Sequence, residues 1–223
     1  RTTLFFQGCP LNCRWCHNPE SQPLSDDPAT DQSYSCLRPY YRKIPYQSAR
    51  RVTVSEMMTE LRKDLIFFDE SGGGVTFSGG EPLMQLEFLR ELSKQCRNEN
   101  IHVTLDTSGY APWSVYEKIL PLMNLLLFDL KLMDDSKHQK YTGVSNRLIL
   151  DNLQNLRDMG YPLIVRVPLI PDITDTSVNL EQISEYLHKF QPVPEIQLLP
   201  YNPMGIEKYN KLNKGQNLSN LKT

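Results

Sequence analysis

The sequence has neither a long apolar run nor a strong excess of charge of one sign. No segment reaches the roughly 18 consecutive apolar residues that a membrane span requires, and no charged and then apolar leader opens the chain. The 24 Lys and Arg residues nearly balance the 26 Asp and Glu residues, which leaves a net charge of −2. A global basic field that would attract nucleic acids or anionic membranes is excluded, and we expect a cytoplasmic protein with neither kind of partner.

Cysteine is scarce and unevenly distributed. Of the 5 cysteines in 223 residues, three lie within QGCPLNCRWCHNPE, at Cys9, Cys13 and Cys16, with no fourth nearby. The other two are Cys36 and Cys96. An odd number of cysteines in a chain too large to need disulfide bonds favours a reducing compartment and a metal-binding or catalytic role for the clustered thiols.

Internal repeats and low-complexity tracts are also absent. Instead, short apolar runs alternate with amphipathic helical patterns, and 39% hydrophobic residues suffice for one core. Because strands that alternate with helices pair in parallel, we predict an α/β fold, a partial (β/α)6 TIM-like barrel of parallel strands with outer helices. The predicted strands are Thr3–Gln7, Gly74–Phe77, Ile101–Asp106, Asn124–Lys131, Leu163–Ile170 and Glu195–Pro200.

We expect one domain over residues 1–223, with an N-terminal segment missing before Arg1. The clearest helix begins with a capping-box pattern at Thr53 and Glu56 and continues along one apolar face to Phe68. Similar patterns cover residues 86–96, 153–159 and 180–187. Residues 21–51, rich in proline, serine and charge, are expected to form an insertion or lid loop, and residues 208–223 a polar C-terminal tail.

The three clustered thiols fit two kinds of metal site. A structural zinc site would add His17 or Cys36 as fourth ligand, but such sites usually join two separated ligand pairs. A cubane iron–sulfur cluster can use three thiolates and leave one iron open for a substrate. The Cys-x3-Cys-x2-Cys spacing, with Trp15 before the last cysteine, favours the cluster and is similar to the signature of the radical S-adenosylmethionine (radical SAM) superfamily.

A second candidate motif follows the second predicted strand. In TFSGGEPLMQ, Gly79 and Gly80 allow the backbone to approach a ligand without a Cβ clash, and Glu81 supplies a carboxylate. Taken alone, Gly-Gly-Glu is also ordinary chemistry for a turn between a strand and a helix. Because this motif and the cysteine loop both follow strands, we expect them at the strand ends where parallel α/β barrels assemble active sites.

These two motifs occur with several others in a defined order. RTTLFFQGCPLNCRWCHNPESQ is followed by GGGVTFSGGEPLMQ, LDTSGY, LLLFDLKLMD, YTGVSNRLILDNL, VRVPLIPDITD and LLPYNPMGIEKY. Together they make the chain resemble the glycyl radical enzyme activating enzymes of the radical SAM superfamily, of which the pyruvate formate-lyase activating enzymes are the best known. The resemblance covers nearly the whole chain except residues 21–51 and the extreme C-terminus.

The resemblance implies a role for each residue of a larger set. Cys9, Cys13 and Cys16 would ligate one [4Fe-4S] cluster, and together with Lys131 and Arg166 they make up the implied catalytic set. The residues implied to bind S-adenosylmethionine are Trp15, His17, Gly79, Gly80, Glu81, Asp106, Ser108, Asp129, Lys131 and Arg166.

Within that set the implied contacts differ. Trp15 and His17 would flank the adenine, and the Gly-Gly-Glu turn would lie by the methionyl amine. Lys131 would pair with the methionyl carboxylate, a charge-assisted contact that gains strength away from water. Arg166 would help to hold the cofactor or the substrate peptide, because a charge within an apolar strand needs a partner. A monovalent cation would lie near Asp106, Thr107 and Asp129.

The implied reaction is radical activation of a partner enzyme. S-adenosylmethionine would be cleaved reductively to methionine and a 5′-deoxyadenosyl radical, which removes a hydrogen from a glycine of a partner glycyl radical enzyme. A flavodoxin- or ferredoxin-type donor would supply the electron, and the activating enzyme is expected to be a monomer.

Several alternatives stay open. A radical SAM enzyme could act on a small molecule or on RNA, although the near-neutral charge disfavours RNA. A zinc-stabilised module without activity and a truncated, inactive homologue are the other readings of the cysteine loop. Asp129 and Lys131 could also be a mere surface ion pair. His102, His138 and Cys96 are predicted to be surface or packing residues rather than ligands.

The chain departs from the family pattern at two places. Asn202 stands where many relatives carry a histidine, so we assign it no role in proton transfer. Many relatives also carry a ferredoxin-like insert with two cysteine-rich clusters in the region of residues 21–51, where this chain has only Cys36. Because one cysteine cannot hold a cluster, we expect a single [4Fe-4S] centre.

Overall fold

A computed structural model of the chain describes residues 1–22, 34–38, 50–203 and 205–211. The chain divides into two compact units, which are treated separately below. Unit 1 contains Arg1–Cys9, Ser21–Thr107 and Ala111–Leu126, and unit 2 contains Pro10–Glu20, Ser108–Tyr110 and Leu127–Thr223. The cysteine motif is therefore shared, with Cys9 in unit 1 and Cys13 and Cys16 in unit 2.

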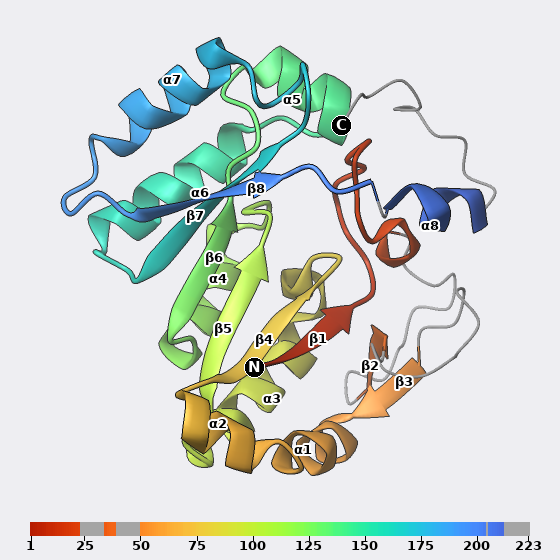
Figure 1. The fold of residues 1–223 in the computed structure, drawn as a ribbon. Helices are drawn as coiled ribbons and strands as arrows, with labels where there is room; N and C mark the ends of the chain where they lie inside the picture. Colours follow the sequence, from red (N-terminus) through yellow and green to blue (C-terminus); the bar gives the residue numbers. More distant parts are fainter. Residues whose placement is uncertain (23–33, 39–49, 204, 212–223) are drawn as a thin grey trace. The chain divides into compact units, whose positions relative to one another are not determined.

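Unit 1 is a sheet with the strand order β3-β2-β1-β4-β5 (Figure 1). β1 (Thr2–Phe6) pairs in parallel with β4 (Gly74–Gly79), which pairs in parallel with β5 (His102–Thr107). β2 (Tyr34–Arg38) is antiparallel to β1 and to β3 (Arg50–Thr53). The helices of this unit are α1 (Val54–Arg62), α2 (Leu65–Ser71), α3 (Leu86–Asn98) and α4 (Trp113–Ile119), with short 3-10 helices at Pro82–Gln85 and Leu120–Leu122.

The core of unit 1 lies between the parallel strands and helix α3. Phe6 at the end of β1 packs edge to face against Phe77 of β4 and Phe88 of α3, with ring centroids 5.8 Å and 6.2 Å apart. All three side chains are buried. This packing fixes the ends of β1 and β4, from which the cysteine loop and the Gly-Gly-Glu turn depart.

Unit 2 contains the parallel pair β7 (Leu163–Leu169) and β8 (Glu195–Pro200), in register from Ile164 opposite Glu195 to Leu169 opposite Pro200. β6 (Leu125–Asp129) begins in unit 1 and ends in unit 2. The helices of unit 2 are α5 (Asp135–Thr142), α6 (Arg147–Asp158), α7 (Ser177–Leu187) and α8 (Gly205–Lys211); a 3-10 helix at Pro19–Ser21 lies at the boundary of the units.

The predicted α/β class and all six predicted strands are confirmed, with bounds that differ by up to two residues at either end. The capping box is also confirmed, because the Thr53 hydroxyl accepts from Glu56 N–H while the Glu56 carboxylate accepts from Thr53 N–H. The single helix predicted to continue to Phe68 is wrong. α1 ends at Arg62 and α2 begins at Leu65, since Asp64 leaves the helical conformation and its carboxylate accepts the Thr2 hydroxyl of β1.

Two sequence-based expectations, the lid and the C-terminal tail, fall partly outside the described residues. Residues 34–38 and 50–51 of the predicted lid form β2 and the start of β3, so strand pairing there was missed. Residues 23–33 and 39–49 lie outside the described residues, and a lid there stays a prediction. Residues 208–211 of the predicted tail belong to α8, and residues 212–223 also lie outside. Within the described part of the chain, no helix has the length and apolar character to cross a membrane.

Candidate active site

In unit 1, the loop that carries Cys9 is joined to the Gly-Gly-Glu turn by backbone hydrogen bonds. Gly80 N–H donates to the Phe6 carbonyl at 2.8 Å, and Glu81 N–H donates to the Gly8 carbonyl at 2.7 Å. On the other side of the loop, Cys9 N–H donates to the Gln22 carbonyl at 3.1 Å. The backbone on both sides of Cys9 is therefore fixed by contacts that need no metal.

The two glycines of the turn are required by this close backbone approach. Gly79 has a φ of +112°, and a Cβ there would lie 2.3 Å from the Phe6 nitrogen. A Cβ on Gly80 would lie 2.1 Å from the Gly8 carbonyl oxygen. The end of β1 thus accounts for Gly79 and the cysteine loop for Gly80, and approach of a ligand to them stays a prediction.

Glu81 is fully buried and held by neutral donors within unit 1. The Thr107 hydroxyl lies 3.0 Å from both carboxylate oxygens, and Leu83 N–H donates to one of them at 3.3 Å. Behind Thr107 stands the buried Tyr116 hydroxyl, 3.3 Å from the Thr107 Oγ1. Burial raises the pKa of Tyr116, and the negative charge of Glu81 raises it further, so the phenol stays protonated.

Asp106 lies next to Thr107 on β5 and accepts a hydrogen bond of 2.7 Å from the Ser78 hydroxyl of β4. Asp106 and Thr107 therefore belong to unit 1, whereas Asp129, the third residue of the predicted cation site, belongs to unit 2. The cation stays a prediction.

In unit 2, the loop that carries Cys13 and Cys16 is attached to the end of α5. Asn12 N–H donates to the Thr142 carbonyl at 2.7 Å, and Arg14 N–H donates to the Tyr141 carbonyl at 3.0 Å. These are carbonyls of the last helical turn, which have no partner within the helix. Trp15 is buried with its ring centroid 6.3 Å from that of Tyr141.

Helix α8 holds the other side of the same loop. Lys208 Nζ donates to Asn18 Oδ1 and to Glu20 Oε1, both at 2.9 Å, and Tyr209 Oη lies 3.4 Å from the Cys13 carbonyl. Lys208 and Tyr209 were missed as site residues, because the polar end of the chain looked like a tail. The motif LLPYNPMGIEKY, which contains both, was the available signal.

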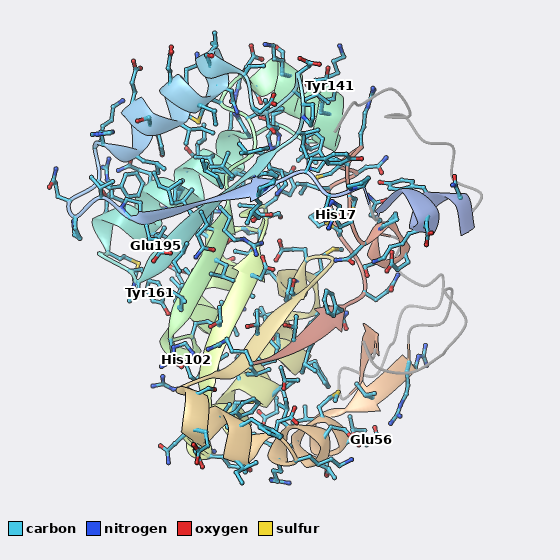
Figure 2. All side chains as sticks on the ribbon, viewed as in Figure 1. His17, Glu56, His102, Tyr141, Tyr161 and Glu195 are labelled. Carbon is cyan, nitrogen blue, oxygen red and sulfur yellow. The ribbon has the colours of Figure 1, made fainter. Side chains whose placement is uncertain are left out.

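His17, which is labelled in Figure 2, lies with its ring centroid 6.3 Å from that of Tyr201. Burial lowers the pKa of His17, and the Lys208 ammonium lowers it further, so the imidazole is neutral near pH 7. A neutral, half-buried ring suits the predicted contact with adenine. Asn202, which is exposed, bonds His17 through its backbone.

The most highly charged cluster of the site lies at the end of β6. Asp129 accepts from Lys131 Nζ at 3.0 Å and from Arg166 Nε and Nη2 at 3.0 Å and 2.8 Å. Their side chains are only 21%, 8% and 18% exposed, in the order Asp129, Lys131, Arg166. The interpretation of Asp129 and Lys131 as a mere surface pair is therefore wrong.

The charges in this cluster do not cancel. Burial by itself would raise the pKa of Asp129, but Lys131 and Arg166 outweigh burial and hold that pKa below its usual value. One carboxylate faces two cations, so the three side chains together carry an excess positive charge in a mostly buried place. Such a cluster favours an anion as its next partner.

Cys13 lies within electrostatic reach of this cluster. Burial raises the pKa of the Cys13 thiol to about 12, while the Lys131 ammonium acts to lower it. Cys9, Cys13 and Cys16 are not joined to one another by disulfide bonds; Cys13 is buried, and the other two are partly exposed. Soft thiols with a nearby cation suit an iron–sulfur cluster, which takes cysteine as thiolate. Among the residues that the structure describes, no group of three or more His, Cys, Asp or Glu side chains already forms a metal-binding arrangement.

The remaining candidates are more ordinary. Ser108 is buried and its hydroxyl lies 3.4 Å from Tyr110 N–H. His138 bonds the Val144 carbonyl and the Thr142 hydroxyl inside unit 2. These contacts account for His138 as a packing residue. Cys96 is fully buried, with its sulfur 3.8 Å from that of Met58 in the core of unit 1.

The sequence-predicted residues thus fall into two groups. Unit 1 brings together Cys9, Gly79, Gly80, Glu81, Asp106 and Thr107. Unit 2 contains Cys13, Trp15, Cys16, His17, Ser108, Asp129, Lys131 and Arg166.

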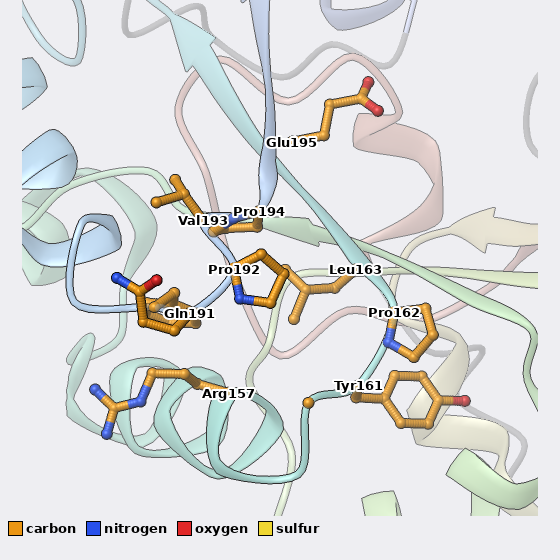
Figure 3. A pocket seen from close by; sticks show the side chains of 11 residues that line it. Arg157, Tyr161, Pro162, Leu163, Gln191, Pro192, Val193, Pro194 and Glu195 are labelled. Carbon is orange, nitrogen blue, oxygen red and sulfur yellow. The ribbon is translucent and has the colours of Figure 1, made fainter.

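A separate cavity of about 270 Å³ lies at the opposite strand ends of unit 2 (Figure 3). It is lined by Leu163 and Glu195, the first residues of β7 and β8, and by Tyr161, Phe190 and Pro192. Parallel α/β barrels build their active sites at the other ends of the strands. We therefore do not assign this cavity to the site.

Comparison with known proteins shows the family to which the chain belongs. Residues 3–181 match the model of the radical SAM superfamily. The trans-4-hydroxy-L-proline dehydratase activating enzyme of Clostridioides difficile is 34% identical over 251 residues, which cover 96% of this chain and 83% of that protein. The pyruvate formate-lyase-activating enzyme of Clostridium pasteurianum is 35% identical over 213 residues, which cover 96% of this chain and 80% of that protein.

A solved structure extends the comparison to the fold. Streptococcus suis SuiB bound to its precursor peptide SuiA matches 96% of this chain and 41% of its own with a TM-score of 0.65, at 13% sequence identity. At this identity the likeness shows the fold alone, and it confirms the predicted partial barrel.

Proposed function

Since the chain belongs to the radical SAM superfamily and, within it, to the activating enzymes of glycyl radical enzymes, we propose that it activates such a partner by abstracting a hydrogen atom from one of its glycines. S-adenosylmethionine and a [4Fe-4S] cluster are the cofactors that this family implies. When bound, they supply a 5′-deoxyadenosyl radical made by one-electron cleavage of S-adenosylmethionine.

The observation that carries the proposal is the buried cluster of Lys131, Asp129 and Arg166 near Cys13. Its excess positive charge suits the carboxylate of the methionyl group, and Asp129 keeps the two cations from repelling each other before a ligand binds. Because Cys13 lies within electrostatic reach, a ligand held here would lie close to a cluster-binding thiol.

Glu81 supplies the opposite charge. Its carboxylate accepts from the Leu83 N–H and the Thr107 hydroxyl in unit 1, and its negative charge suits the methionyl ammonium. Thr107 bonds both carboxylate oxygens and thereby fixes the plane of the group before a ligand arrives. Charged groups held ready in a dry site stabilise a ligand more than mobile groups do.

The aromatic residues of the cysteine loop serve the rest of the cofactor. Trp15, fixed against Tyr141, and the neutral ring of His17 offer flat surfaces for adenine. Cys9, Cys13 and Cys16 would hold three irons of the cluster and leave the fourth free for the methionyl group. The buried surroundings of Cys13 would exclude water and oxygen from the radical.

Further parts of the proposal concern cofactors and partners. A single cluster is part of the proposal, because Cys36 is the only cysteine in the sequence of residues 21–51 and one cysteine cannot hold a second cluster. We include in the proposal a monovalent cation near Asp106, Thr107 and Asp129, a flavodoxin- or ferredoxin-type donor, a monomeric state and a cytoplasmic location.

The proposal is tested by loading the protein with iron and sulfide without oxygen and adding dithionite and S-adenosylmethionine. We expect a brown protein that releases 5′-deoxyadenosine, measured by chromatography. The variant Cys13→Ala should lose both iron and product. Cys96→Ala is the matched control, because this equally buried thiol packs against Met58 and should be dispensable.

A colourless protein that retains zinc and forms no product would contradict the proposal and favour a zinc-stabilised module. Product that forms equally well in Cys13→Ala would contradict the role of the cysteine motif. Release of 5′-deoxyadenosine without formation of a glycyl radical on any partner glycyl radical enzyme would point instead to a small-molecule substrate.

A further inference from the structure

Lys131 follows β6 on a loop whose backbone is held by one buried asparagine of α7. Asn179 is 5% exposed, and its Nδ2 donates to the carbonyl of Lys131 at 3.1 Å and to that of Thr174 at 2.8 Å. Its Oδ1 accepts from Met133 N–H at 3.0 Å. One side-chain amide therefore satisfies three backbone groups, two in the loop after β6 and one in the loop after β7.

A second buried asparagine supports the same loop further along. Asn146, at the start of α6, is 2% exposed and donates through Nδ2 to the carbonyls of Leu132 at 2.9 Å and Met133 at 2.8 Å. The backbone of residues 131–133 is thus held from α6 and from α7. A buried amide is retained only where it finds such partners, since an unpaired one is costly.

These contacts matter because of what Lys131 carries. Leu130 N–H donates to the Arg166 carbonyl at 2.9 Å, so the chain before Lys131 is fixed to β7. Asn179 fixes the chain at Lys131 itself. A lysine side chain has four rotatable bonds, and its ammonium reaches a defined place only when the backbone beneath it does not move.

We propose that Asn179 is a positioning residue, which fixes the backbone of Lys131 and so aims the ammonium at the methionyl carboxylate of S-adenosylmethionine. The inference rests on the proposed function and goes beyond it by naming what makes the carboxylate contact selective. Asn146 supports the same loop, and Asn179 contributes more because it bonds the Lys131 carbonyl directly.

The test uses two ligands that differ only at the carboxylate. Dissociation constants are measured for S-adenosylmethionine and for decarboxylated S-adenosylmethionine, which keeps the sulfonium, the amine and the adenine. Both are measured with the cluster-loaded protein and its variants Asn179→Ala and Asn179→Asp. The aspartate variant has the same size and keeps the acceptor for Met133 N–H, but it turns an oxygen toward two carbonyls.

In both variants we expect the Kd for S-adenosylmethionine to rise about tenfold and that for the decarboxylated ligand to change less than about twofold. The control is Tyr186→Phe on the same helix, which loses a bond of 3.2 Å to the Leu150 carbonyl. It should change neither constant. General loosening of the fold would weaken both ligands together, so the ratio of the two constants separates positioning from stability.

Equal weakening of both ligands, or no weakening of either, would overturn the inference. If Asn179→Ala does not fold, Asn179→Asp, which preserves the volume, still gives the ratio. Failure of the proposed function is recognised separately, because the unchanged protein would then bind neither ligand and release no 5′-deoxyadenosine. In the other case, the unchanged protein binds S-adenosylmethionine and releases 5′-deoxyadenosine while the Asn179 variants keep its preference for S-adenosylmethionine over the decarboxylated ligand. That result contradicts only the role of Asn179.

Discussion

Two buried carboxylates, one in each unit, are surrounded in opposite ways. Glu81, after β4, accepts from the Thr107 hydroxyl and the Leu83 N–H, which carry no charge. Asp129, at the end of β6, accepts from Lys131 and Arg166, which are both cations. Both carboxylates are shielded from water, and the neighbours described here distinguish them: a hydroxyl and a backbone N–H at Glu81, and two cations at Asp129.

This contrast fits the two ends of an amino acid. The methionyl group of S-adenosylmethionine carries an ammonium and a carboxylate, and a protein that binds both needs one site of each charge. In the proposed function Glu81 attracts the ammonium, and Lys131 and Arg166 attract the carboxylate. Substitutions that change the charge around Glu81 or around Asp129 should therefore affect binding of the ammonium and of the carboxylate separately.

The largest effect is expected from Asp129→Asn, which removes the carboxylate that Lys131 and Arg166 both contact in a mostly buried place. We expect the free energy of unfolding to fall by about 3 kcal/mol, measured by urea denaturation. Asp158→Asn is the control, because Asp158 pairs with Arg157 at 2.8 Å on the surface and should contribute little. A loss no larger than that of the control would mean that the two cations do not depend on Asp129.

The stabilisation contributed by Asp129 should also depend on pH. Because the folded-state pKa of Asp129 is depressed, its stabilisation is fully present above the ordinary aspartate pKa of about 3.9 and is lost as pH falls toward the folded value. The difference in unfolding free energy between the unchanged protein and Asp129→Asn should therefore shrink below about pH 4. A difference that stays constant between pH 7 and pH 3 would contradict the depressed pKa.

A smaller effect is expected from Glu81→Gln, which removes the negative charge of the other site but keeps its size. The Kd should rise about tenfold for S-adenosylmethionine and equally for its decarboxylated form, because both ligands keep the ammonium. Glu87→Gln is the control, since Glu87 pairs with Arg90 at 3.2 Å on the outer face of α3, where both side chains are exposed. If the Kd rose for S-adenosylmethionine alone, Glu81 would act at the carboxylate end of the ligand and not at the ammonium, which would contradict this prediction.

The smallest effect is expected from Tyr116→Phe. The hydroxyl lost there lies 3.3 Å from the Thr107 Oγ1, one step removed from Glu81. We expect a loss of about 1 kcal/mol in unfolding free energy and no change in Kd for S-adenosylmethionine, measured by urea denaturation and calorimetry. A tenfold rise in Kd would instead make Tyr116 a member of the ligand site.

Much of this architecture could be predicted from local pattern. The six parallel strands and the capping box at Thr53 follow from apolar spacing and from pairs of residues three apart, which need no knowledge of the fold. The break between α1 and α2 could not be predicted, because it depends on a hydrogen bond from Thr2 to Asp64. β2 was also missed, because its pairing depends on β1, which is distant in the sequence.

The residue types of the candidate site could be predicted from the sequence, but the residues that hold them in place were missed. Arg166 could be singled out because a charge within an apolar strand demands a partner, whereas Lys131 was implied only by the family resemblance. Asn179 could not, because asparagine within a helix usually faces water, and only the fold shows that its amide meets three backbone groups. Lys208 and Tyr209 were missed because their contacts join residues nearly two hundred positions apart.

The most direct test of the contrast between the two carboxylates is the preference of Lys131→Met for S-adenosylmethionine over its decarboxylated form. Removal of this cation should reduce that preference about tenfold while the affinity for the decarboxylated ligand stays the same. Lys137→Met, on the exposed face of α5 in the same unit, should retain the full preference. A Lys131→Met protein that still prefers the carboxylate to the same degree would contradict the account.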